Sequence, residues 1–93
     1  MTGRNVILTG GRVKVGYATA LRLLENGANL TVTTRFPALA LAQFKQEKNY
    51  NQWENRLFIY GLDLRNIKAV HTFIEFYKQK HGTLDILINN AGW

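Results

Sequence analysis

Apolar and polar residues follow two alternating patterns along this chain. Short apolar runs bounded by glycine or polar residues predict buried strands, and longer stretches with apolar residues three to four positions apart predict helices. The expected strands are residues 5–9, 30–34, 57–61 and 84–89. The expected helices are residues 15–26, 37 to about 48 and 66–81, with a loop or short helical turn at 49–55. Strands that alternate with helices in this way are typical of βαβ units and a parallel sheet.

The helix patterns also predict which residues face the sheet. In the first helix the apolar face comprises Val15, Ala18, Leu21 and Leu24. In the third helix it comprises Ile67, Val70, Phe73 or Ile74, and Tyr77. Right-handed crossovers place the helices on both faces of the sheet. We therefore expect an α/β fold, a three-layer Rossmann-type doubly wound parallel sheet with strand order 3-2-1-4.

A glycine turn joins the first strand to the first helix. Gly10 can turn sharply because it has no Cβ to clash, and Gly16 lets the helix pack closely on the strands. The unpaired N–H groups of a helix N-terminus, here at Val15, favour an anion such as a phosphate. Such turns also occur without a ligand, and the spacing is not the plain G-x-G-x-x-G form, since Lys14 stands at the place of a third glycine.

The composition narrows the class of protein. The 93 residues suit one small domain or part of a larger one, and the 46% of hydrophobic residues suit a folded core. The net charge of +6 is compatible with nucleic acid, a membrane surface or an anionic cofactor. However, no run approaches the ~20 apolar residues of a membrane span, and neither a signal-peptide pattern nor a nucleic-acid-reading motif occurs. We therefore expect a cytoplasmic protein that binds neither membranes nor nucleic acid.

The chain has few cysteine and histidine residues that could bind a metal. The chain has no cysteine, so it has no thiolate metal site and no disulfide framework. His71 and His81 have no partners at the spacing of a metal site or a catalytic triad, and we interpret both as surface residues. Trp53 is predicted to be a packing residue.

Three motifs follow three of the expected strands in order. They are Thr9-Gly10 with Gly16, then Asp63, then Asn89-Asn90-Ala91-Gly92. Together they resemble the short-chain dehydrogenase/reductase family over nearly the whole chain. The resemblance implies a dinucleotide cofactor and hydride transfer between its nicotinamide and a carbonyl or alcohol substrate.

The resemblance also implies roles for individual residues. Asp63 would accept a hydrogen bond from the adenine amino group, with Leu64 beside it as a further cofactor contact. The backbone of Asn90, Ala91 and Gly92 would lie along the adenosine ribose, whereas Asn89 would mainly tie strands together. From the residues alone, Asp63 can also be a turn or capping carboxylate at the start of the next helix, and the two roles are compatible.

The chain departs from the family's pattern in two ways. Lys14 replaces the middle glycine of the first motif, and no tyrosine is followed four residues later by lysine, the pair that the family uses in catalysis. We therefore expect residues 1–93 to be the N-terminal cofactor-binding segment of a longer single-domain enzyme, inactive alone. The alternative is a non-catalytic dinucleotide-binding or regulatory module. The complete protein is expected to be a homo-oligomer, because family members usually pair through later helices.

Basic residues in two of the loops bear on the choice of cofactor. An NAD-selective site carries an acid near the end of the second strand, where it binds the ribose 2′-hydroxyl. Here that position is Thr34, followed by Arg35, and no acid is near. Arg35 and either Arg12 or Lys14 can converge on a 2′-phosphate, although each can also be an ordinary surface charge. We predict that NADP(H) is favoured over NAD(H).

Overall fold

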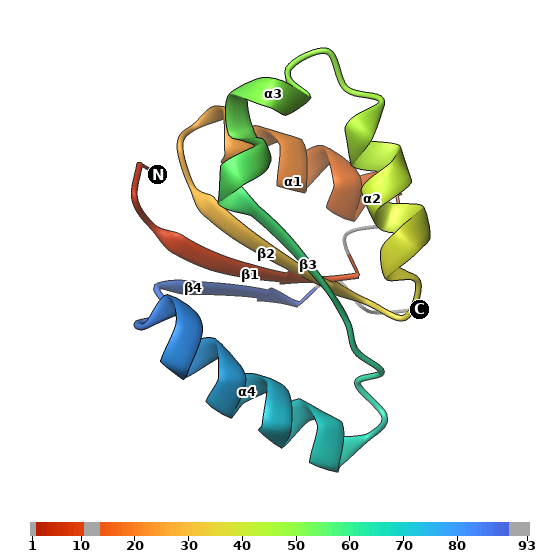
Figure 1. Ribbon diagram of the computed structural model, residues 1–93, viewed down its shortest axis with the longest axis vertical. Helices are drawn as coiled ribbons and strands as arrows, with labels where there is room; N and C mark the ends of the chain where they lie inside the picture. Colours follow the sequence, from red (N-terminus) through yellow and green to blue (C-terminus); the bar gives the residue numbers. More distant parts are fainter. Residues whose placement is uncertain (1, 11–13, 90–93) are drawn as a thin grey trace.

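A four-stranded parallel sheet forms the middle layer of the protein (Figure 1). The computed structural model describes residues 2–10 and 14–89. The strands are β1 (Asn5–Thr9), β2 (Asn29–Thr34), β3 (Leu57–Gly61) and β4 (Ile86–Asn89). Their order is β3-β2-β1-β4, and all three strand pairs are parallel. The predicted strand order is therefore confirmed.

Helices cover both faces of the sheet. The helical elements are α1 (Lys14–Glu25), α2 (Pro37–Lys45), α3 (Tyr50–Trp53), a 3-10 turn (Glu54–Arg56) and α4 (Ile67–His81). Figure 1 shows α1, α2 and α3 on one side and α4 alone on the other, which confirms the three-layer arrangement. Within the described residues, no helix is both long and apolar enough to cross a membrane.

The core lies between the sheet and the layer of α1, α2 and α3. Successive residues of a strand point to opposite faces, so alternate positions of β1 and β2 share one environment. The side chains buried together on this face are Val6, Leu8, Ala20, Leu24, Leu30, Val32, Phe44 and Trp53. Trp53 is only 2% exposed, which confirms its predicted packing role. Its ring meets those of Phe44 and Tyr50 edge to face.

Two residues do not follow the predicted helix faces. Ala18 is exposed, whereas Gly16, Ala20 and Leu24 are buried, so the face of α1 that packs on the sheet is rotated from the predicted one. Alanines occur on both of these neighbouring faces, so the sequence pattern alone does not show which one packs on the strands. In α4, Ile67 is 70% exposed because it lies in the first turn, whereas Tyr77, nearer the end of α4, is 4% exposed.

Two further predictions are corrected near the end of α4. The strand β4 begins at Ile86 rather than at residue 84, since the backbone N–H of Asn5 donates to the Asp85 carboxylate at 2.8 Å and the chain enters the ladder afterwards. His81 is half-buried rather than on the surface. Its Nε2 lies 3.3 Å from the Tyr60 hydroxyl, and its ring centroid lies 4.6 Å from that of Phe58. His71 is exposed, as predicted.

Candidate cofactor-binding site

The carboxyl ends of all four strands meet at one edge of the sheet, because the strands are parallel. Two backbone hydrogen bonds join the loops that leave this edge. The N–H of Gly10, after β1, donates to the carbonyl of Thr33 at 2.9 Å. The N–H of Leu62, after β3, donates to the carbonyl of Thr34 at 2.8 Å. The loops after β1 and β3 are thus tied to the end of β2, between them.

Gly10, the first residue after β1, has the backbone expected for a sharp turn. Gly10 has a φ of 69°, in the left-handed region that residues with a Cβ rarely adopt. The helix α1 begins four residues later, and Gly16 is buried in it. Arg12 and the side chains of Lys14 and Val15 lie outside what the structure describes. The described residues on either side of the loop, a strand that ends before Gly10 and the start of α1, are elements that a phosphate site uses.

Thr34 and Arg35 lie at the end of β2 as predicted. Thr34 is 7% exposed, and its hydroxyl accepts the N–H of Phe36 at 3.1 Å, which folds the chain back after the strand. Arg35 is exposed, and its guanidinium carbon lies 5.5 Å from the centroid of the Phe36 ring. Arg35 therefore presents a positive charge at the carboxyl edge of the sheet, and Thr34 adds no negative one.

Asp63 is a turn carboxylate in this structure. Its Oδ1 accepts the backbone N–H of Arg65 at 3.0 Å, and its carbonyl accepts the N–H of Asn66 at 3.0 Å. The cap of α4 is Asn66, whose side-chain oxygen accepts the N–H of Ala69 at 3.1 Å. The turn role proposed for Asp63 is confirmed, the capping role belongs to Asn66, and the adenine role stays a prediction.

Sequence reasoning missed the side chain that pairs with Asp63. Arg65 Nη2 donates to Asp63 Oδ2 at 2.9 Å, and Nε lies 3.1 Å from Oδ1 and 3.3 Å from Oδ2. The Arg65 side-chain and backbone hydrogen bonds, helped by the charges of Arg65 and Arg35, lower the pKa of Asp63 to about 2. Asp63 and Arg65 stand two residues apart in the turn after β3, which places them near each other but does not by itself show that they pair.

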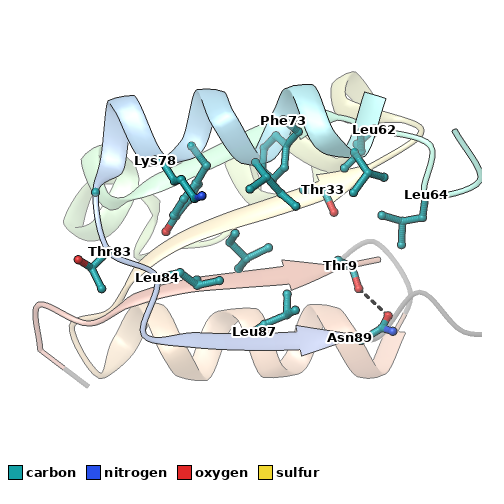
Figure 2. A pocket seen from close by; sticks show the side chains of 15 residues that line it. Thr9, Thr33, Leu62, Leu64, Phe73, Lys78, Thr83, Leu84, Leu87 and Asn89 are labelled. Carbon is teal, nitrogen blue, oxygen red and sulfur yellow. Dashed lines mark hydrogen bonds between the residues drawn. The ribbon is translucent and has the colours of Figure 1, made fainter. Parts of the chain in front are cut away.

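Asn89 ties two strands together. The Thr9 hydroxyl donates to Asn89 Oδ1 at 2.9 Å, and the two residues are partners in the register of β1 and β4. This contact, drawn as a dashed line in Figure 2, fits the support role expected for Asn89. Asn90, Ala91 and Gly92, predicted to lie along the ribose, are outside the described residues.

An apolar cavity of about 600 Å³ lies between α4 and the strands β1 and β4 (Figure 2). Its walls include Ile7, Phe73, Leu84 and Leu87, and among the predicted cofactor contacts of the described chain only Leu64 reaches it. Thr33 also lines it, with a buried hydroxyl that has no hydrogen-bond partner in the described residues. The cavity runs from Leu64 and Asn89 near the carboxyl edge of the sheet to Thr83 and Leu84 before β4, and neither Arg35 nor Asp63 lines it.

A parallel sheet in this order, with a glycine turn and a helix N-terminus at its carboxyl edge, defines a nucleotide-binding fold of the Rossmann type. The model of the short chain dehydrogenase family matches residues 4–93. The chain therefore belongs to the short-chain dehydrogenase family of oxidoreductases.

Three similar proteins show how much of a family member this chain spans. It is 37% identical over 90 residues to (-)-isopiperitenone reductase of Mentha piperita, covering 96% of this chain and 29% of that protein. The structure of menthone neomenthol reductase from Mentha piperita matches with a TM-score of 0.89 at 24% identity, over 100% of this chain and 33% of that one. The structure of ElxO with NADP bound matches with a TM-score of 0.78 at 31% identity, over 99% and 36%. The chain thus corresponds to about a third of these proteins, their N-terminal part.

Proposed function

We propose that this chain is the cofactor-binding part of an NADP(H)-dependent oxidoreductase. The observation that carries the proposal is the end of β2, where Thr34 and the exposed Arg35 stand in place of the acid of an NAD-selective site. The bound cofactor would exchange a hydride with a carbonyl or alcohol substrate. The membership of the family and the NADP bound to the similar ElxO support this assignment.

The described residues fit a dinucleotide. The turn at Gly10 and the N-terminus of α1 suit the phosphates, with Val15 and Gly16 in that helix. Leu64 is 40% exposed next to Asp63 and offers an apolar surface to the adenine. The Asp63 oxygens already accept from Arg65, so a bond from the adenine amino group would be an additional one on the same carboxylate. We assign the ribose to Asn90, Ala91 and Gly92, as the resemblance implies.

The preference for a 2′-phosphate follows from charge. Arg35 can form a paired hydrogen bond with the phosphate, and Arg12 or Lys14 would add a second positive charge. A charge-assisted hydrogen bond contributes on the order of 1.5–3 kcal/mol, so two would favour NADP(H) by roughly a hundredfold or more. An acid in place of Thr34 would instead repel the phosphate.

We also propose that this chain is one part of a longer single-domain enzyme. Its 93 residues contain no Tyr-x-x-x-Lys pair, so the acid–base group for the substrate would come from another segment. The apolar cavity beside α4 supports this, since natural domains rarely leave such a space uncovered. A homo-oligomeric complete protein and a cytoplasmic location stay predictions from the sequence.

The proposal is tested by cofactor titration of the complete protein and its variants, followed by quenching of protein fluorescence. Arg35→Ala should weaken NADP(H) binding at least tenfold more than NAD(H) binding, because a charge-assisted hydrogen bond is lost only with the 2′-phosphate. Thr34→Asp added to it should reverse the preference. Arg22→Ala removes an exposed arginine of α1 as a matched control and should change neither affinity. If Arg35→Ala and Lys14→Ala both keep the full discrimination, these residues do not bind the phosphate.

A further inference from the structure

Asp63 brings a negative charge to the same edge of the sheet as Arg35. The two residues leave adjacent strands, β3 and β2, and the hydrogen bond from Leu62 N–H to the Thr34 carbonyl holds their loops together. Of the groups that lower the pKa of Asp63, Arg35 contributes the least, so the two side chains are coupled only weakly, through charge. An unpaired carboxylate here would compete with a 2′-phosphate for Arg35 and would also repel it.

Arg65 forms a hydrogen-bonded ion pair with the Asp63 carboxylate. Its backbone N–H and two guanidinium nitrogens all donate to Asp63, at distances between 2.9 and 3.3 Å. A fork of this kind fixes both the charge and the orientation of the carboxylate. Arg35 makes no such bond with Asp63 in the described residues; its guanidinium lies over the Phe36 ring instead. Within the described residues, the Asp63 carboxylate is thus hydrogen-bonded by Arg65 and not by Arg35.

We propose that Arg65 is a positioning residue that determines cofactor specificity: it pairs with Asp63 so that Arg35 stays available for the 2′-phosphate. This inference rests on the proposed function, because it needs Arg35 to bind that phosphate. The Asp63–Arg65 pair is solvent-exposed, with 38% and 77% of the two side chains accessible, so its loss costs the fold little. Loss of the pair would instead change the net charge near the 2′-phosphate.

The test compares four forms of the complete protein, unmodified, Arg65→Ala, Asp63→Asn and the double variant, in titrations with NADPH and NADH. Arg65→Ala should weaken NADPH binding about fivefold and NADH binding less than twofold, the size expected for one uncompensated charge in a solvated site. In the Asp63→Asn protein, the same Arg65→Ala change should have no effect on the ratio of the two affinities. Arg65→Lys should restore part of the NADPH affinity, because it returns the charge without the fork.

A matched control separates this mechanism from a general loss of positive charge. Lys68→Ala removes one exposed cation from the first turn of α4, three residues from Arg65, and should leave the ratio unchanged. The inference would be overturned if Lys68→Ala lowered NADPH affinity as much as Arg65→Ala does. It would also be overturned if Arg65→Ala weakened the binding of NADPH and NADH equally, or if its full effect persisted in the Asp63→Asn protein. The unmodified protein tests the proposed function separately: if it does not prefer NADPH, that function is wrong and the inference falls with it.

Discussion

The two faces of the sheet are built differently. On the face covered by α1, α2 and α3, the alternate residues of β1 and β2 are Val6, Leu8, Leu30 and Val32, all fully buried. On the face covered by α4, the residues between them include Thr31 and Thr33, and an apolar cavity of about 600 Å³ remains beside β4. Leu87 of β4 lines this cavity and is 60% exposed. One face is closed by the described residues, whereas the other has apolar walls without a complete cover.

The difference shows which part of the fold these residues stabilise by themselves. Apolar area removed from water supplies the main favourable term in folding. The α4 face also buries Ile7, Thr31 and Thr33 of the central strands, but it leaves Leu84 and Leu87 38% and 60% exposed. The strands β1 and β2, whose side chains are buried on the first face, under α1, α2 and α3, hold the carboxyl edge in place. The second face adds α4 and the turn at Asp63, whose charged groups are exposed. Stability and cofactor selectivity therefore depend on separate residues, and substitutions can distinguish them.

The largest expected effect is a loss of stability on the closed face. In the chain of residues 1–93, Phe44→Ala should lower the free energy of unfolding by about 3–5 kcal/mol, because it leaves a cavity next to the Tyr17 and Trp53 rings. Leu87→Ala should change it by less than about 0.5 kcal/mol, since that side chain is already largely exposed. Urea titration followed by circular dichroism measures both. Equal losses for the two variants would contradict the contrast between the faces.

A smaller effect is expected from pH on the open face. Burial, with a contribution from Lys80, lowers the pKa of His81 below 6.5, so the unfolded chain takes up the proton before the folded one does. The free energy of unfolding should therefore be undiminished above the unfolded pKa and should decrease as the pH falls through 6.5 toward the folded pKa. His81→Gln should remove this slope below pH 6.5, whereas His71→Gln, at an exposed site, should keep it. A slope unchanged in His81→Gln would assign the effect to other groups.

The sequence predicts the order of the elements well, because strand and helix have different apolar periods and glycines separate them. The sequence pattern places the start of β4 two residues too early, at Leu84 instead of Ile86. Leu84 is apolar, but it lines the cavity instead of pairing with β1. The sequence pattern also treats His81 as a surface group. The His81 ring packs against Tyr77, four residues earlier on α4, and against Phe58 and Tyr60 on β3. The contacts with β3 are distant in sequence, so a local pattern does not predict them.

The candidate site was likewise predictable only in part. Gly10 and Arg35 were predictable because a parallel sheet brings every strand's carboxyl end to one edge. The paired state of Asp63 was not, since it depends on the turn geometry that turns Arg65 back onto the carboxylate. Sequence motifs thus indicate where charges gather, and the structure shows which of them are already paired.

A titration of the unmodified complete protein with NADPH and NADH at low and high salt tests the cofactor preference most directly. NADPH should bind more tightly than NADH by roughly a hundredfold or more at low salt, and the preference should decrease as salt screens the exposed Arg35 at the end of β2. Equal affinities, or a preference for NADH, would contradict the assignment of Arg35 and the argument from the missing acid.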